Sequence, residues 1–569
     1  MYISPTLLLL LPVVSAWCPI YGPSFPPPKN PSSSKAFQAA LEELTTSIDV
    51  GLSDPNNEVT SAHTVSVQLF NAYTEEPLYT LHREGSTLNT TVGVAKVDSD
   101  SIWRIASISK LVIVYLLLKE VGDQFWNTPV AKAIPELREN AKWKENKVDF
   151  VDWESVTLGT LAGHTSGVVK NLIYLVGGNP FLDGTLDIDD FGLPDLGAKD
   201  LPRCTIGLEF SCDRAEFFAA LDTRQPIFAA NTQPIYANTP YVILGYALES
   251  ITGKSLSEIL QSFVDELKLD MTTPVKPDIS RAVIPYSAER SGYLVQTGEA
   301  WPLGGLYSTF NDLTKIGRSI LNSKFMSENA TRAWLKPVSF VSDLRSAIGR
   351  PWEIVRIDTR STRGVIDVYG KSGGQGPYSL FLGLVLDYNF GFAAAVAGKG
   401  PPSVNWVTAK ITEKILPALE EAAREEAHEV YAGTYIANTN GTNSTIVLST
   451  EVGRPGLSVT TFTSRGADVL SAMSQLYGEP ITTENFRLVP TNLEQDTKNG
   501  TKEVAWKWIE NMSTPNEKPS AWSACASWFN IDEPSYGRYS FDSVVFTLGP
   551  DGKATKIRPR AFALDYQKV

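Results

Sequence analysis

The chain has 569 residues, 43% of them hydrophobic and 20% charged, which suits roughly two to four cored domains and excludes a disordered protein. Its 63 acidic and 50 basic residues give a net charge of -13. Because no Lys/Arg-rich run occurs, we expect no nucleic-acid partner. The four cysteines and four histidines show no zinc-ligand spacing, so we expect no metal and no cofactor.

The first 16 residues are predicted to be a secretory signal peptide. Leu7–Leu11 begins a short apolar core, and Val14, Ser15 and Ala16 supply a small-residue cleavage site. No Lys or Arg precedes the core, so a hydrophobic N-terminal strand is the alternative. The apolar run is too short to cross a bilayer, and we expect no membrane anchor. The sequence thus predicts a secreted protein.

Acceptor sequons and cysteines agree with secretion. Asn-x-Ser/Thr sequons, which are sites for N-glycans, start at Asn89, Asn329, Asn440, Asn443, Asn499 and Asn511. In an oxidising compartment Cys204 and Cys212 are close enough in sequence to form a disulfide. Cys18 and Cys525 would then form a second one, although four cysteines allow three connectivities.

The predicted elements begin with a Pro/Ser-rich lead-in and alternate between helix and strand. A helix over 36–50 is followed by a hairpin over 63–83, and a long helix starts near Ser107. The stretch 126–221 is mixed and contains an acidic, Gly-rich loop. Later segments are a helical run over 242–260, strands over 365–370, 378–386 and 390–398, and a helix over 402–427.

The order of these elements predicts an α+β domain. Strands from both ends of the segment would form one antiparallel sheet flanked by helices, with an all-helical region between them. After residue 428, short β-type runs separated by Gly, Asn and Pro predict a small all-β domain. The predicted organisation is a signal peptide (1–16), a lead-in (17–35), the α+β domain (36–427) and the all-β domain (428–569).

The first candidate for chemistry is the Ser-x-x-Lys pair of Ser107 and Lys110. A serine at the start of a helix has backbone N–H groups and the helix dipole available to an oxyanion. A lysine three residues later lies on the same face, so its amine can reach the serine hydroxyl. The alternative is an N-cap serine followed by a solvated lysine.

Two more motifs follow at separated positions. Tyr236 and Asn238 form a Tyr-x-Asn motif before a helical run, and the alternative is a packing tyrosine with a capping asparagine. Lys371 opens a Lys-Ser-Gly-Gly motif that also contains Ser372, Gly373 and Gly374. Glycine there lets a substrate lie against a strand edge, and the alternative is an ordinary Gly-rich turn.

In this order the three motifs resemble the penicillin-recognising serine hydrolases. Within them the chain is most similar to the branch of class C β-lactamases, DD-peptidases and family VIII esterases, over residues 36–425. Flanking phrases add to the likeness: residues 105–110 (IASISK), 164–167 (HTSG), 236–245 (YANTPYVILG) and 304–309 (GGLYST). Residues 431–435 (YAGTY) open a segment similar to the β-barrel appendage of secreted fungal-type members.

The resemblance implies a β-lactamase/transpeptidase-like fold and a role for each motif residue. Ser107 would be the nucleophile that forms an acyl-enzyme. Burial near Lys371 would lower the pKa of Lys110 enough for it to accept the serine proton. Tyr236, between the two lysines, would be base or proton donor, and the division of roles with Lys110 stays open.

Further positions are implied around the substrate. Asn238 would hydrogen-bond to Lys110 and to the acyl side of the substrate, and Lys371 would supply a positive field. Ser372 and Gly373 would line the substrate edge. The N–H groups of Ser107 and Gly374 would form the oxyanion hole.

Two short segments of the sequence also match motifs of other protein classes. Residues 370–374 match Gly-x-Ser-x-Gly, the nucleophile elbow of α/β-hydrolases, but a strand and not a helix is predicted next. Residues 187–192 suggest a calcium loop but have Phe191 at a ligand position. His164 is expected to be structural.

The sequence therefore predicts a serine hydrolase acting on an ester, lactone, lactam or peptide-like small molecule. An acyltransferase of the same fold, or a binding protein that keeps the fold without turnover, are the alternatives. The oligomeric state is not predicted.

Overall fold

The structure is a computed structural model, and it forms two compact units. One unit comprises Leu41–Ile357 and Asp367–Lys414, and the other comprises Met1–Ala40, Asp358–Ile366 and Ile415–Val569. The described residues are 22–175, 181, 184–197, 201, 204–206, 210–359, 364–400, 402–438, 441–478, 480–483, 486–510 and 531–569. The predicted signal peptide, Cys18, Cys525, Asn440 and Asn511 lie outside these ranges.

An eight-stranded sheet forms the centre of the first unit, in the order β2-β1-β12-β11-β10-β9-β8-β7. Its strands are β1 (Thr64–Asn71), β2 (Tyr79–Arg83), β7 (Ser339–Phe340), β8 (Ser346–Ile348), β9 (Glu353–Thr359), β10 (Gly364–Gln375), β11 (Tyr378–Val385) and β12 (Phe390–Ala397). The predicted hairpin is confirmed as β1 and β2. Strand β1 also pairs antiparallel with β12, from Thr64↔Ala397 to Asn71↔Phe390. Strands from the two ends of the domain therefore share one sheet, as predicted.

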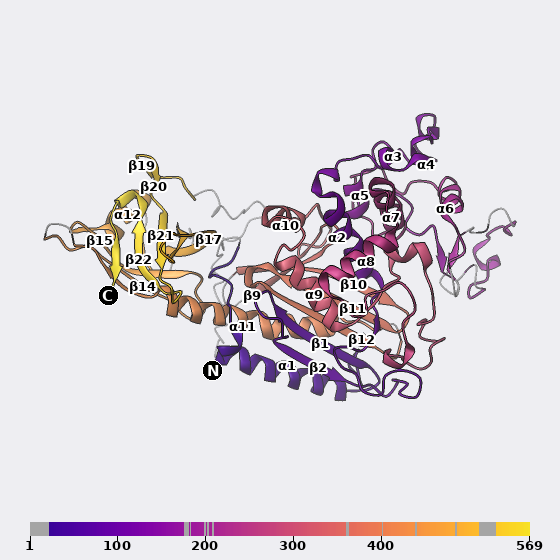
Figure 1. Cartoon of the computed structure of the whole chain (residues 1–569), viewed down its shortest axis with the longest axis horizontal. Helices are drawn as coiled ribbons and strands as arrows, with labels where there is room; N and C mark the ends of the chain where they lie inside the picture. Colours follow the sequence, from indigo (N-terminus) through magenta and orange to yellow (C-terminus); the bar gives the residue numbers. More distant parts are fainter. Residues whose placement is uncertain are drawn as a thin grey trace, which may run out of the picture. The chain divides into compact units, whose positions relative to one another are not determined.

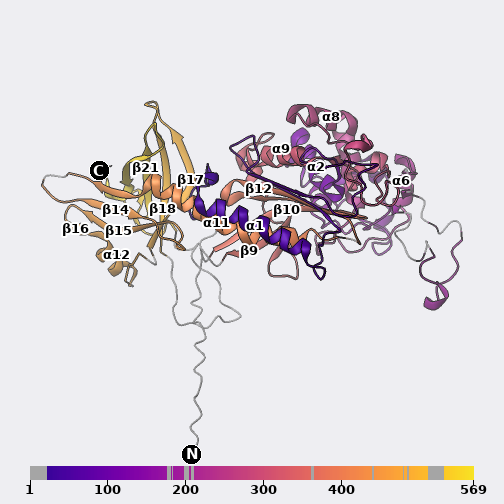
Figure 2. The same ribbon diagram turned by 90° about the horizontal axis from the view of Figure 1, so that it is seen from below.

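Helices lie on both faces of this sheet, as Figures 1 and 2 show. Residues 41–53 of helix α1 (Lys35–Ser53) and 405–414 of helix α11 (Asn405–Tyr431) lie on one face, where Lys414 forms an ion pair with Glu43 at 2.9 Å. Helix α9 (Phe310–Leu321) lies on the other face, and Gln68 of β1 donates to the Thr314 hydroxyl at 2.8 Å. Because both faces are covered, β1 and β12 are buried along their whole length.

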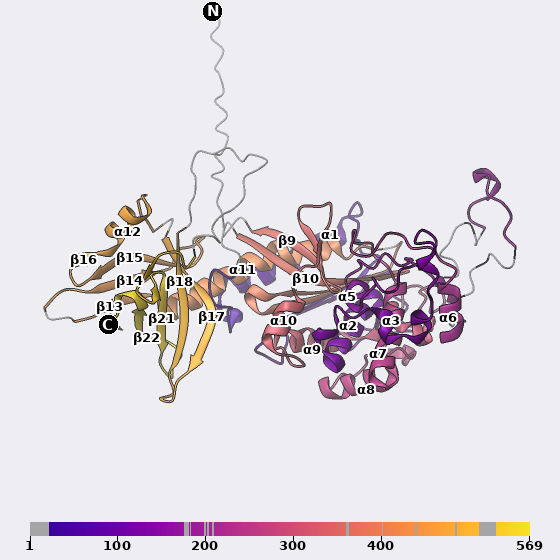
Figure 3. The ribbon, with the colours of Figure 1, turned by 90° about the horizontal axis from the view of Figure 1, so that it is seen from above.

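A helical region separates β2 from β7 along the chain, as predicted. Its helices are α2 (Ser109–Val121), α3 (Val130–Ala133), α4 (Pro135–Arg138), α5 (Leu158–Ala162), α6 (Arg214–Leu221), α7 (Thr239–Thr252), α8 (Leu256–Leu267) and α10 (Glu328–Trp334). Figure 3 shows α2, α5 and α7 grouped together, and α7 contacts both of the others. Two-stranded pairs join β3 (Trp103–Arg104) to β6 (Tyr307–Ser308) and β4 (Tyr174–Leu175) to β5 (Thr205–Ile206).

The helical run predicted over 242–260 is broken in two, and this part of the prediction is wrong. Helix α7 ends at Gly253, whose φ of +70° is left-handed and therefore favours glycine. Ser255 then caps α8 by accepting the N–H of Glu258, whose side chain accepts the N–H of Ser255 in return. This reciprocal capping box starts a new helix at that point.

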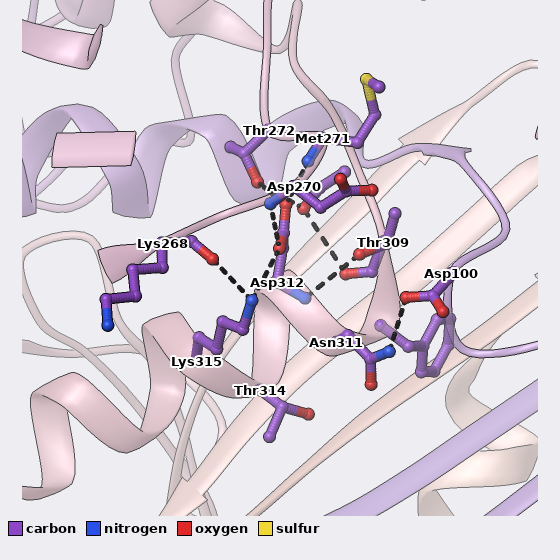
Figure 4. A network of polar contacts seen from close by, with 12 residues as sticks. Asp100, Lys268, Asp270, Met271, Thr272, Thr309, Asn311, Asp312, Thr314 and Lys315 are labelled. Carbon is purple, nitrogen blue, oxygen red and sulfur yellow. Dashed lines mark hydrogen bonds and ion pairs between the residues drawn. The ribbon is translucent and has the colours of Figure 1, made fainter. Parts of the chain in front are cut away.

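A buried carboxylate fixes the N-terminus of α9, as Figure 4 shows. The side chain of Asp312 accepts the N–H groups of Asp270 (2.9 Å) and Met271 (2.7 Å) and the hydroxyl of Thr272 (3.0 Å). Burial raises the pKa of Asp312, and these hydrogen bonds offset part of that rise. Thr309 caps the helix by accepting the Asp312 N–H at 3.1 Å. The first turn of α9 is thereby held against residues 270–272.

A closed β-barrel forms most of the second unit. Its strands run in the order β14-β13-β23-β22-β21-β18-β17-β15-β16, and a β14–β15 pairing closes the ring. They are β13 (Gly433–Ile436), β14 (Thr445–Ser449), β15 (Leu457–Ser464), β16 (Ala467–Asp468), β17 (Phe486–Asp496), β18 (Lys502–Glu510), β21 (Ser543–Leu548), β22 (Ala554–Pro559) and β23 (Tyr566–Lys568). A helix α12 (Val469–Tyr477) and a small hairpin, β19 (Ser535–Tyr536) with β20 (Tyr539–Ser540), complete it. The prediction of a small all-β domain is confirmed.

Aromatic side chains form the core of this barrel. Trp506 packs edge-to-face on Phe546 at a centroid distance of 5.6 Å, and Phe462 packs on Trp508 at 4.9 Å. The short β-type runs of the sequence lie at residues 444–450, 456–462, 486–490, 503–509 and 543–549, and they form β14, β15, β17, β18 and β21. None of the helices in the described ranges is long and apolar enough to cross a membrane.

The structure also bears on the predicted modifications. The Cys204–Cys212 disulfide is present. Among the sequons, Asn329, Asn443 and Asn499 have exposed side chains. Asn89 is half-buried, and its amide donates to the carbonyl of Tyr286 at 2.6 Å.

Candidate active site

Ser107 lies in a tight turn directly before α2. The 3₁₀ turn η2 (Ala106–Ile108) leads into the helix, and Ala106 has a left-handed φ of +46°, a conformation that is strained for a non-glycine residue. The hydroxyl of Ser109 holds the turn, because it donates to the Ala106 carbonyl (2.7 Å) and accepts the Leu306 N–H (3.1 Å). This leaves the Ser107 side chain half-buried at the start of the helix.

Lys110 reaches Ser107 from one turn further along, as the spacing predicts. Its Nζ lies 3.0 Å from Ser107 Oγ, donates to Asn238 Oδ1 at 2.7 Å and also bonds to the Leu303 carbonyl. Burial, helped by the charge of Lys371, holds the pKa of Lys110 well below its ordinary value of 10.5, and Glu353 offsets a part of this. A buried amine with a lowered pKa can accept a proton from the serine hydroxyl.

Tyr236 contacts Ser107 from the opposite side. Its Oη donates to Ser107 Oγ at 2.7 Å. The nitrogens of Lys110 and Lys371 lie 5.2 and 5.1 Å from the centre of its ring, so the tyrosine lies between the two lysines, as the resemblance implied. The side chain is 39% exposed, which leaves it accessible to a ligand.

Asn238 directs its side chain to Lys110 and not to the helix that it precedes. It is the N-cap residue of α7 but makes no side-chain capping bond. Instead Oδ1 accepts from Lys110 and Nδ2 donates to Asn171 Oδ1 at 2.8 Å. The alternative of a capping asparagine is therefore wrong.

Lys371 is held by a carboxylate that sequence reasoning missed. Its Nζ forms an ion pair with Glu353 Oε1 and donates to the Ser372 carbonyl at 2.9 Å. The other oxygen of Glu353 accepts the Ser372 N–H at 2.8 Å. Burial by itself lowers the pKa of Lys371, but Glu353 and Tyr236 outweigh it and raise that pKa above 10.5. Lys371 therefore keeps its charge.

The glycines of this motif bring β10 against the nucleophile turn. A Cβ on Gly373 would lie 2.1 Å from the carbonyl oxygen of Ile105, so only glycine allows this approach. Gly373 is thus packed on the turn, while Ser372 is half-buried. Gly374 is exposed, and a Cβ there would meet no atom closer than 4.0 Å. The exposed edge of β10 at Gly374 is where a backbone N–H can meet a ligand.

His164 packs against the ring of Tyr236. The two rings stack at a centroid distance of 4.7 Å, and Nδ1 of His164 accepts the Ala237 N–H at 3.2 Å. Nε2 lies 3.1 Å from the Tyr241 hydroxyl, which donates to the Ala162 carbonyl. Hence Nε2 is the protonated nitrogen of a neutral imidazole. Burial, Lys371 and Lys110 lower the pKa of His164 well below 6.5, in keeping with a structural role.

The competing motifs lack the structures that they require. Tyr378–Val385 is strand β11, so no helix follows Ser372 as a nucleophile elbow needs. Residues 187–192 form an exposed loop with a 3₁₀ turn at Asp189–Phe191. In the part of the chain that the structure describes, no three His, Cys, Asp or Glu side chains are grouped to hold a metal ion.

Two family models together match most of the chain. The family described as Beta-lactamase matches residues 57–407. A second, described as "Beta-lactamase-like-like, C-terminal domain", matches residues 423–569.

Individual relatives extend over both parts. A beta-lactamase-like protein of Arthroderma benhamiae is 29% identical and covers 93% of this chain and 92% of its own length. A probable hydrolase of a Phoma species is 24% identical over 92% of this chain and 87% of its own length. A solved penicillin-binding protein homologue from Pyrococcus abyssi covers 93% of this chain and 99% of its own, with 16% identity and a TM-score of 0.46. The chain has a β-lactamase/transpeptidase-like fold with a C-terminal β-barrel, and it belongs to the beta-lactamase family.

Proposed function

We propose that this protein is a serine hydrolase that forms an acyl-enzyme on Ser107. The observation that carries the proposal is the position of Ser107 Oγ, 3.0 Å from Lys110 Nζ and 2.7 Å from Tyr236 Oη. A serine hydroxyl in contact with a buried amine and a phenol has both a proton acceptor and a proton donor at hand. The substrate class is an ester, lactone, lactam or peptide-like small molecule.

The first step is attack of Ser107 Oγ on the acyl carbon. Its proton passes to neutral Lys110, which we favour as the base because burial and Lys371 lower its pKa. The tetrahedral oxyanion takes hydrogen bonds from the N–H groups of Ser107 and Gly374, each typically worth about 3–4 kcal/mol. As the bond to the leaving group breaks, Tyr236 gives that group a proton and regains one from Lys110.

The second step returns the free enzyme. Water attacks the acyl carbon and transfers a proton to Lys110, which is neutral again after the first step. The acyl carbon–Oγ bond then breaks, and Ser107 regains its proton. If an alcohol or amine takes the place of water, the same site carries out acyl transfer.

The test is turnover of activated aryl esters by the wild type and by Ser107→Ala. The variant should lose turnover while its melting temperature stays within a few degrees, because Ser107 is half-buried and loses one oxygen. A retained wild-type rate in the variant would refute the nucleophile assignment. A wild type that neither turns over any ester nor takes up a fluorophosphonate label would be a binding protein.

We also propose that the protein is secreted and glycosylated. The apolar segment with a small-residue cleavage site, the Cys204–Cys212 bond and the exposed sequons at Asn329, Asn443 and Asn499 support this. The expected result is a mature chain that starts after residue 16 and shifts to lower mass with an endoglycosidase. Retention of residues 1–16 in the purified protein would contradict it.

A further inference from the structure

The ammonium group of Lys371 is held inside the protein. A lysine has three N–H donors; Lys371 directs donors to the Glu353 carboxylate and to the Ser372 carbonyl, and its nitrogen lies 5.1 Å from the centre of the Tyr236 ring. The lysine side chain has 0% exposure. A carboxylate on a bound substrate therefore cannot reach this ammonium group unless it displaces the groups that bury it.

Glu353 also neutralises the charge of Lys371. One of its oxygens contacts the ammonium group and the other accepts the Ser372 N–H, so the carboxylate bridges the side chain of Lys371 and the next peptide group. Charge-assisted bonds on both oxygens hold it in place. The Lys371–Glu353 ion pair therefore contributes no net charge to the site.

The other titratable groups at the reaction centre add little positive charge. The pKa of Lys110 and that of His164 are both lowered, by burial first and then by the lysine charges. Charged groups that act on Lys110 are Lys371 and Glu353. Lys170 lies at the edge of the site, because its backbone carbonyl accepts the Asn238 N–H at 2.8 Å. Its side chain is exposed to solvent.

We propose that the site selects substrates that carry no charge next to the scissile bond, namely neutral esters or lactones, and disfavours those with a carboxylate on the leaving-group side. This inference rests on the proposed function. An anion there would lose its hydration without gaining a free cation, and it would approach Glu353. The groups left for recognition, the Ser372 hydroxyl and the Gly374 N–H, suit an uncharged carbonyl or ether oxygen.

The experiment compares two esters that form the same acetyl-enzyme. Methyl 3-acetoxybenzoate is neutral, and 3-acetoxybenzoate carries a carboxylate on the same leaving group. Each kcat/KM is divided by the rate of hydroxide hydrolysis of that ester. We expect the wild type to favour the neutral ester by at least about tenfold, and Glu353→Gln to reduce this preference by about tenfold, because it removes one negative charge near the site.

The controls separate this inference from the proposed function. Glu328→Gln, an exposed substitution on α10, should keep the wild-type preference. A wild type that favours the anionic ester, or a preference unchanged by Glu353→Gln, overturns the inference. If Glu353→Gln does not fold, two measurements on the wild type decide the question: its preference between the two esters, and the effect of added salt on kcat/KM for the anionic ester. A kcat/KM that does not fall with salt supports the inference, and one that falls with salt overturns it.

Two further outcomes identify the source of a failure. If the wild type favours the anionic ester and Lys170→Gln abolishes that preference, Lys170 supplies an anion site and the inference is wrong. If neither ester is hydrolysed and Ser107 takes up no fluorophosphonate, the proposed function itself fails.

Discussion

Replacing Gly373 by alanine should separate the two segments that build the site. The new Cβ would lie 2.1 Å from the carbonyl oxygen of Ile105, whereas real contacts of this kind stay above 3.0 Å. Both partners are backbone, so neither can rotate away, and β10 must move from the Ser107 turn by about 1 Å. A displacement of this size between reacting groups costs on the order of 10²-fold in rate, or about 2.7 kcal/mol in activation free energy.

The assay is kcat/KM for an activated aryl ester, normalised to the fraction of chains that a fluorophosphonate labels. Gly391→Ala is the matched control, since its Cβ would meet the Phe70 ring at 2.3 Å on strand β12 of the same sheet. We expect the control to lower the melting temperature but to keep kcat/KM per labelled chain. A Gly373→Ala enzyme within about threefold of the wild type would refute the proposed packing of β10 against the nucleophile turn.

Three other substitutions test separate parts of the site and the fold. Lys110→Met should reduce turnover by about 10²–10⁴-fold if Lys110 is the base. The variant should also be more stable than the wild type at pH 7, because the folded wild type holds Lys110 at a lowered pKa and therefore binds fewer protons than the unfolded chain. Wild-type stability should accordingly rise with pH towards 10.5, and denaturant melts at several pH values measure this. His164→Ala should cost about 10–100-fold in kcat, from lost stacking on Tyr236 and an unpaired Ala237 N–H. His164→Asn, which can accept that N–H and tolerates the φ of +59°, should recover part of the rate; equal rates for the two variants would exclude this positioning role. Burial raises the pKa of Asp387 from 3.8 to about 6; the nearby charge of Asp367 adds to this rise, and that of Lys336 opposes it. The ionised group therefore destabilises the fold at pH 7, and wild-type stability should increase as pH falls through 6 towards 4. Asp387→Asn should add about 1–3 kcal/mol at pH 7 and remove this dependence, and urea melts at pH 7 and pH 4.5 that show no difference between the two proteins would contradict it.

The elements with strong periodicity could be predicted from the sequence. The hairpin of β1 and β2 and the buried strands β10 to β12 follow from alternating or continuous apolar residues, and helix α1 follows from apolar residues at helical spacing, although it extends to Ser53 and not to Val50. The break between α7 and α8 was missed, because apolar residues continue at helical spacing through Gly253 and Ser255. The signals that end one helix and cap the next were present but were outweighed by that periodicity.

Only part of the barrel could be predicted from the sequence. Five of its strands could be identified, but β13, β22 and β23 are short or carry charged residues on the outer face, as in the Lys556 and Arg558 positions of β22. Closure also depends on the pairing of β13 with β23, strands from opposite ends of the domain, which local sequence does not encode. Register and closure come from the packing of the whole barrel around its aromatic core.

At the site, motif residues were identified and their supports were not. Ser107, Lys110, Tyr236 and Lys371 belong to short patterns, whereas Glu353 is a single acidic residue beside the buried Trp352 and Ile354. A charged residue at the start of an apolar strand is a weak signal, and its partner emerges only when β9 lies beside β10. The Leu303 carbonyl that binds Lys110 is a backbone group, which side-chain patterns do not reveal.

Intact-mass measurement during turnover shows whether Ser107 carries the acyl group. The full-length protein is mixed with a slowly hydrolysed aryl ester, quenched in acid and mapped by peptide mass. We expect one acyl group per chain, on the peptide that contains Ser107, which disappears as substrate is exhausted and is absent in Ser107→Ala. Turnover without a covalent adduct, or an adduct on Ser372 instead, would contradict it.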